Sequence, residues 1–351
     1  MPDKPNYDFE TGVYRPPSEG GSYSLLVRFT RNCPWNRCEF CGMYKNERFE
    51  LRSVAEIKSD IDAMAAICND LEARSNALGQ DGRLTQEAAI ALIDAHPELN
   101  RHQGFVMLYH WLLSGAQTAF LQDANSLIMK TEHLVEALRY LRRTFPFITR
   151  VTSYARSKTV AGKSLDELTA IRQAGLDRLH LGLESGDNDL LKRIKKGVTA
   201  DGHIKGGQKA LKAGFQVSEY WMPGLGGLAM WQQHARNTAR VLNAINPHYI
   251  RSRPFHPWPG TPMQSAVLGN AFQMLTAPEQ LEELKLTMES LDVTSRVCFD
   301  HAGNYWKNRR GEHLFTMSYE GYKFPEEKQK VLDLIEEGLQ ANNHQPGSLR
   351  F

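Results

Sequence analysis

Hydrophobic positions along the chain alternate between a strand pattern and a helical pattern. Short apolar runs are followed by longer segments in which apolar residues recur every three or four positions. Six such runs predict strands at residues 24–30, 118–121, 148–154, 178–183, 216–222 and 248–253. Alternating strands and helices form a parallel sheet with right-handed crossovers.

Helical periodicity follows the predicted strands. One helix begins near Ser53 and another near Thr131, and Gly175 and Gly214 stand where glycine commonly ends a helix. Further helices are predicted at residues 164–174, 199–213 and 230–245. Six β/α units are fewer than the eight of a complete (β/α)8 barrel. The pattern therefore predicts an α/β fold, a partial (β/α)6 TIM-type barrel with a helical insertion and a C-terminal α-rich extension.

Two regions interrupt this rhythm and set the predicted domain boundaries. Residues 72–117 form an insertion with a helix at 85–95 and an aromatic stretch at 105–113. After the barrel, we expect a helix at 277–291, begun by a capping box at Thr276, a candidate strand at 294–299 and a helix at 326–339. The predicted divisions are an N-terminal extension (1–23), the barrel (24–265) and a C-terminal extension (266–351).

The composition is that of an ordinary globular protein, with 41% hydrophobic and 23% charged residues. The 42 basic and 40 acidic residues nearly cancel, so no overall positive field attracts nucleic acid. The N-terminal residues lack the apolar core of a secretory signal, and no apolar run reaches the roughly 18–20 residues that span a bilayer. We expect a cytoplasmic protein with neither a membrane nor a nucleic-acid partner.

Three of the five cysteines, Cys33, Cys38 and Cys41, gather in one short segment directly after the first predicted strand. A loop at the carboxyl end of a barrel strand is where such folds place their chemistry. The other two, Cys68 and Cys298, lie far away in sequence. An odd number of cysteines argues against a disulfide framework and favours thiolates gathered around a metal.

Spacing alone leaves three interpretations of this segment open. Three thiolates can hold a [4Fe–4S] cluster and leave one iron free for an exogenous ligand. Structural zinc normally takes a complete set of four Cys or His ligands, and no fourth such residue lies near the loop. In the third interpretation the cysteines bind no metal.

The segment resembles the cluster loop of the radical S-adenosylmethionine (SAM) superfamily. That loop usually reads C-x3-C-x2-C, with an aromatic residue before the last cysteine and often a glycine after it, and Phe40 and Gly42 occupy these positions. Four residues separate Cys33 from Cys38, where the common form has three. The resemblance covers about residues 24–265. It is strongest to the branch with oxygen-independent coproporphyrinogen oxidase-like, Elp3-like and methylthiotransferase-like radical domains.

The resemblance implies a set of cofactor-binding residues. The segment GLESG at 182–186, followed by LLKRIKKG at 190–197, resembles the "GLESG…LK…KG" motif of that branch. The family also places cofactor contacts at the ends of the second, third and fifth strands. The implied metal ligands are Cys33, Cys38 and Cys41, and the implied cofactor-binding residues are Phe40, Gly42, Asp123, Ser153, Arg156, Glu184, Ser185 and Met222.

Several of these residues have an ordinary structural explanation as well. Glu184 can be a helix N-cap or part of a buried ion pair, and Asp123 a turn residue. We interpret the basic run at 193–196 as a solvated helix face. His256, Asp300 and His301 on late loops are weak candidates for acid–base or substrate contacts.

The function implied by the resemblance is that of a radical SAM enzyme of the oxidoreductase or transferase type. A [4Fe–4S] cluster, reduced by an external one-electron donor such as ferredoxin or flavodoxin, would cleave SAM to a 5′-deoxyadenosyl radical that abstracts hydrogen from a small-molecule substrate. Cys68 and Cys298 are too few for the second cluster of a methylthiotransferase. The alternatives are an RNA-modifying radical SAM enzyme and a non-catalytic zinc or iron–sulfur binding protein.

Overall fold

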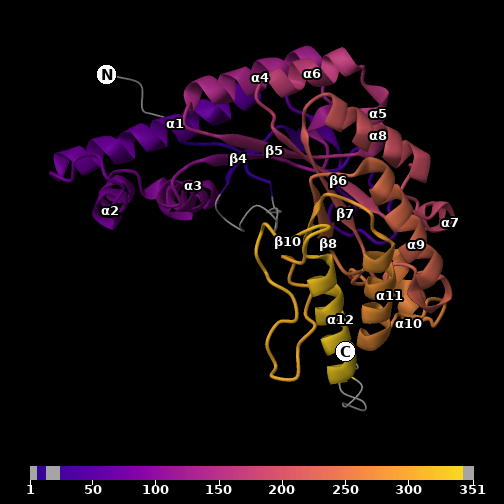
Figure 1. The fold of residues 1–351 in the computed structure, drawn as a ribbon. Coiled ribbons are helices and arrows are strands. Elements are labelled where there is room, and N and C mark those ends of the chain that lie inside the picture. The colour runs from indigo at the N-terminus through magenta and orange to yellow at the C-terminus, as the bar shows by residue number, and fades with distance from the viewer. Residues whose placement is uncertain (1–5, 13–23, 343–351) are drawn as a thin grey trace. The chain divides into compact units, whose positions relative to one another are not determined.

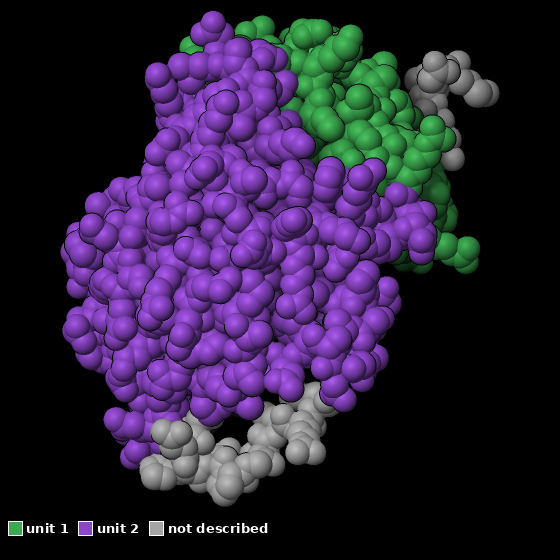
Figure 2. All heavy atoms as spheres, turned by 90° about the vertical axis from the view of Figure 1, so that its right-hand side faces the viewer, with its two compact units in different colours: residues 1–34, 48–154, 169–178 green, residues 35–47, 155–168, 179–351 purple. Residues whose placement is uncertain are grey.

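The fold in Figure 1 is a computed structural model, which describes residues 6–12 and 24–342. The chain divides into two compact units, coloured separately in Figure 2. Unit 1 comprises residues 1–34, 48–154 and 169–178, and unit 2 comprises residues 35–47, 155–168 and 179–351. Most of the predicted N-terminal extension, residues 1–5 and 13–23, lies outside the described residues.

Three parallel strands form the main sheet in the described part of unit 1. They are β1 (Leu25–Arg28), β4 (Thr118–Gln122) and β5 (Arg150–Ala155), in the order β1-β4-β5. The helices α1 (Val54–Ala77) and α4 (Thr131–Thr144) pack against each other (Figure 1). A second, antiparallel pair, β2 (Thr30–Arg31) and β3 (Glu50–Leu51), brackets the segment that carries the cysteines.

Local sequence signals explain the helices of unit 1. Ser53 begins α1 with a capping box that includes Glu56, and the helix continues to Ala77, so it takes the first residues of the predicted insertion. The rest of the insertion contains α2 (Gln86–Ala95), the 3-10 helix η1 (Pro97–Arg101) and α3 (Gln103–Leu113). The aromatic stretch is therefore helical.

The strands of unit 2 follow one another in the order β6 (Arg178–Glu184), β7 (Gln216–Trp221), β8 (Tyr249–Ser252), β9 (Arg296–Cys298) and β10 (Tyr322–Lys323). Strands β7, β8 and β9 are parallel, and β10 runs antiparallel to β9. The candidate strand at 294–299 is thus β9. All six predicted strands are present, which confirms the α/β class with consecutive β/α units.

Helices cover the strands of unit 2, and their apolar faces build its core. The helices are α5 (Ser157–Gly162), α7 (Asn188–Arg193), α8 (Ala200–Lys212), α9 (Gly227–Ile245), α10 (Pro262–Leu268), α11 (Ala277–Ser290) and α12 (Lys328–Asn342), while α6 (Leu165–Gln173) belongs to both units. Helix α11 packs against both α9 and α12 (Figure 1). Buried Trp221 and Ile250 of the strands meet Leu242 of α9 and Leu284 of α11 in this core. Among the described residues, no helix is long and apolar enough to cross a membrane.

Candidate cofactor site

The cysteine segment is anchored to unit 2 through its backbone. Glu39 N donates to the carbonyl of Ile194 at 2.9 Å, and Met263 N donates to the carbonyl of Glu39 at 3.2 Å. Cys41 N approaches the carbonyl of Cys38 at 3.4 Å, so these two cysteines flank a tight turn. All five cysteines are described, and no disulfide links any two of them. In the described ranges, no three His, Cys, Asp or Glu side chains are grouped closely enough to bind one shared metal ion.

A buried ion pair in unit 1 holds the residue that precedes Cys33. The Asp123 carboxylate accepts hydrogen bonds from Arg28 Nε at 2.9 Å and from Asn32 N at 2.8 Å. Asn32 has a left-handed backbone (φ 66°), and its side chain donates to the carbonyl of Arg48 at 2.7 Å. Asp123 therefore positions the start of the cysteine segment, while its contact with a cofactor stays a prediction.

Glu184 and Lys196 form an ion pair in unit 2, with 2.8 Å between Oε1 and Nζ and side chains only 13% and 11% exposed. Gly182 makes room for this pair, since a Cβ atom there would lie 2.4 Å from Glu184 Oε1. The alternative that Glu184 is part of a buried ion pair is thus what the structure shows. The interpretation of residues 193–196 as a solvated face is wrong for Lys196, because the chain turns after α7 with Lys195 in a left-handed conformation (φ 51°).

The Lys196 ammonium and the Arg156 guanidinium influence Cys38. Burial raises the pKa of the Cys38 thiol to about 11, and these two cations act in the opposite direction by favouring the thiolate. Arg156 Nη2 also donates to the carbonyl of Lys196 at 2.7 Å. The sequence thus predicted Arg156 as a site residue but missed Lys196, although the KKG of the motif contains it.

Two more buried titratable groups of unit 2 lie within electrostatic reach of Lys196. Burial raises the pKa of Glu219 well above its ordinary value, with Glu184 adding to the shift and Lys196 opposing it. Burial lowers the pKa of His203 well below its ordinary value. Neither carboxyl oxygen of Glu219 has a hydrogen-bond partner among the described residues. A lone Glu in a strand gave no sequence signal for this site.

A buried network fixes Ser185 and the turn that begins at Met222. His234 Nδ1 lies 2.8 Å from Ser185 Oγ, and His234 Nε2 lies 3.0 Å from the Met222 carbonyl. Burial lowers the pKa of His234 to about 4, so its ring is neutral. Because a carbonyl only accepts, Nε2 carries the proton and Nδ1 accepts from the serine. Glu283 adds a second anchor by accepting from Gly224 N at 2.7 Å.

Phe40 and Met222 contact the same apolar cluster of unit 2. Its buried members are Leu190, Ile194, Leu225, Phe255, Met263 and Phe272. Gly42 is required by packing, because a Cβ atom there would lie 1.9 Å from Trp258 Cδ1. The structure thus brings Phe40 and Met222 together at one apolar cluster, and packing against Trp258 explains why residue 42 is a glycine.

The remaining candidates make structural contacts of their own or are exposed. Ser153 is buried in unit 1, where its Oγ donates to the carbonyl of Tyr154 at 3.0 Å. Asp300 pairs with Arg251 at 2.7 Å, and His301 Nδ1 accepts from Gly303 N at 3.1 Å. Burial lowers the pKa of His301 to about 4. His256 is exposed.

Residues 114–236 match the family model of the Radical SAM superfamily. This segment resembles a radical SAM domain. The matched segment includes Asp123, Ser153, Arg156, Glu184 and Met222 but not the cysteine segment. The superfamily resemblance is therefore confirmed, and members of this superfamily use a [4Fe–4S] cluster and SAM.

Several solved structures align with this chain, each with a TM-score below 0.5. Elp3 from Methanocaldococcus infernus with an N-terminal deletion aligns at 15% identity and a TM-score of 0.47, over 72% of this chain and 61% of that one. Coproporphyrinogen III oxidase (HemN) from Escherichia coli aligns at 13% identity and a TM-score of 0.45, over 76% of this chain and 51% of that one. Methylornithine synthase (PylB) aligns at 15% identity and a TM-score of 0.44, over 77% of this chain and 63% of that one. The alignments thus span less than two thirds of each of these structures, and no curated protein sequence matches significantly.

Proposed function

We propose that Cys33, Cys38 and Cys41 hold the [4Fe–4S] cluster of this radical SAM enzyme and leave one iron for SAM. The observation that carries the proposal is the loop itself, in which three cysteines follow β1 in a chain whose residues 114–236 match the radical SAM family model. Thiolates and sulfides make such a cluster anionic. The cations of Lys196 and Arg156 near Cys38 suit that charge.

The chain's own residues have two tasks in this proposal. Asp123 and Arg28 fix the backbone at Asn32, directly before the first ligand. The apolar cluster beneath Phe40 excludes water from one side of the loop. When bound and reduced, the cluster would supply the electron that splits SAM into methionine and a 5′-deoxyadenosyl radical, and this radical would take a hydrogen atom from the substrate.

The proposed SAM contacts lie at the ends of β6 and β7. Glu184 is the candidate for the hydroxyl or amino groups of SAM, and its carboxylate is oriented by the ion pair with Lys196. The turn after Met222, held by His234 and Glu283, is the candidate surface for the adenine. We propose a small-molecule substrate and an external one-electron donor, in keeping with the charge balance of the chain.

The test is SAM cleavage by the full chain after anaerobic reconstitution with iron and sulfide. With dithionite as the reductant, we expect release of 5′-deoxyadenosine, and we expect Cys38→Ala to abolish it. The control is Cys68→Ala, which removes a half-buried thiol from α1 and should keep the activity. Zinc in place of iron, or cleavage that survives Cys38→Ala, would contradict the proposal.

A further inference from the structure

Trp35, between the first two cysteines, is surrounded by cations of unit 2. The Arg156 guanidinium lies 4.7 Å from its ring centroid, the Arg37 guanidinium 5.3 Å and the Lys158 ammonium 5.9 Å. Each contact falls within the range in which the ring quadrupole attracts a cation. Arg37 and Lys158 are exposed to solvent, and Trp35 is half-buried.

The Trp35 ring is also held firmly in place. Its Nε1 donates to the carbonyl of Lys195 at 2.7 Å. The ring lies on the backbone of Gly197, which has a φ of +75°, and a Cβ atom there would lie 2.3 Å from Trp35 Cζ2. Only glycine therefore fits this position. The ring and the turn at residues 195–197 form one rigid surface.

This surface carries positive charge that the protein does not neutralise. In the part of the chain that the structure describes, Arg37 and Lys158 contact the ring but form no ion pair with a carboxylate. Lys195 is paired with Glu39 at 2.7 Å, yet its side chain is 64% exposed. The excess is local, because the whole chain has a net charge of only +2.

We propose that Trp35, Arg37, Lys158 and Lys195 form the docking surface for an acidic one-electron carrier. This inference rests on the proposed function, since a cluster on the same loop must receive its electron from a partner. The transfer is balanced: the carrier is oxidised by one electron and the cluster is reduced by one. A positive patch raises the rate at which an acidic partner associates, and Trp35 stands two residues after Cys33 and three before Cys38.

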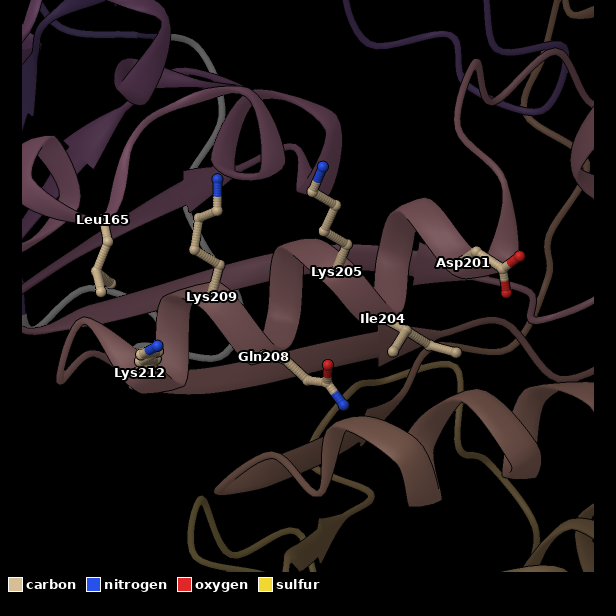
Figure 3. A pocket seen from close by; sticks show the side chains of 7 residues that line it. All are labelled: Leu165, Asp201, Ile204, Lys205, Gln208, Lys209 and Lys212. Atoms are coloured by element: carbon tan, nitrogen blue, oxygen red, sulfur yellow. The ribbon is translucent and has the colours of Figure 1, made fainter.

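A second basic surface provides a matched control. On α8, Lys205, Lys209 and Lys212 line a pocket of about 400 Å³ (Figure 3). Lys209 donates to the carbonyls of Ala161 and Lys163, so it has a structural role and is left unchanged in the control. Lys205 and Lys212 are exposed. They allow the same change of charge on a helix that packs against α5 but carries none of the four proposed docking residues.

The experiment compares two reductants on the reconstituted full chain. Reduced flavodoxin or ferredoxin is the protein donor, dithionite is the small donor, and release of 5′-deoxyadenosine is measured at low ionic strength. For the double variant Arg37→Glu/Lys158→Glu, we expect at least about a tenfold loss of rate with the protein donor and no change with dithionite. Added salt should slow the wild type with the protein donor and leave this variant nearly unaffected.

The outcomes separate this inference from the proposed function. An equal loss with both donors would assign the two cations to the fold or to SAM binding and overturn the docking proposal. An equal loss from Lys205→Glu/Lys212→Glu would overturn it too, because a general change of charge would then explain the effect. If the wild type releases no 5′-deoxyadenosine even with dithionite, the proposed function itself fails.

Discussion

Replacing Lys196 by methionine tests whether the ion pair beside Cys38 is a structural element of the site. The change keeps most of the apolar length of the side chain and removes its charge. Because both side chains of the pair are nearly buried, the Glu184 carboxylate would be left without its cation. Removing one partner of a buried pair costs about 3–5 kcal/mol, whereas an exposed pair contributes about 0–1 kcal/mol. For a unit of this size, about 1 kcal/mol shifts the unfolding midpoint by about 2–4 °C.

The assay is thermal unfolding of the metal-free, reduced chain, followed by circular dichroism. We expect Lys196→Met to lower the midpoint by at least about 6 °C. Lys195→Met is the matched control, since its pair with Glu39 is exposed on the lysine side, and it should lower the midpoint by less than about 4 °C. The double variant Lys196→Met/Glu184→Gln should recover part of the loss, because it leaves no buried charge. A double variant as unstable as the single one would refute the reasoning.

Two further predictions concern stability. Burial raises the pKa of Glu283 from 4.5 to about 8, so between these pH values the folded chain keeps a proton that the unfolded chain loses. The stability of the folded chain therefore falls as the pH rises from about 4.5 to 8, and Glu283→Gln should remove that fall. Unfolding midpoints of both proteins at pH 5 and pH 8 check this, and a constant difference between the two proteins would be the contrary result. Gly186→Ala should destabilise the chain by at least about 1–3 kcal/mol, because its Cβ would lie 2.2 Å from the backbone oxygen of Asn237. Gly162→Ala is the control and should be neutral or slightly stabilising, because the space around its Cβ is open. If Gly186→Ala and Gly162→Ala changed the free energy of unfolding equally in denaturant titrations, the packing argument would be contradicted.

The sequence predicted the elements well because most of their signals are local. Periodicity located the strands and the start of α1 near Ser53, and the capping box at Thr276 marked the first residue of α11. Helices α5 and α10 were missed, since each has at most seven residues and too few turns to show a helical period. Strand β10 has only two residues and exists through its pairing with β9, which is a long-range contact.

The site was harder to predict, because its partners come from distant positions. The cysteine segment is contiguous and was therefore visible. The partners of Asp123 and Glu184 depend on which side chains the fold brings next to them, as with Arg28 and Lys196. The support of the Met222 turn by Glu283 spans more than fifty residues and has no pattern in the sequence.

The metal content of the anaerobically purified and reconstituted chain tests the central claim most directly. Iron and sulfide analysis should find about four of each per chain in the wild type and in Cys68→Ala, and a large loss when Cys33, Cys38 and Cys41 are all replaced by alanine. A stoichiometric zinc ion without iron, or an intact cluster in the triple variant, would contradict it.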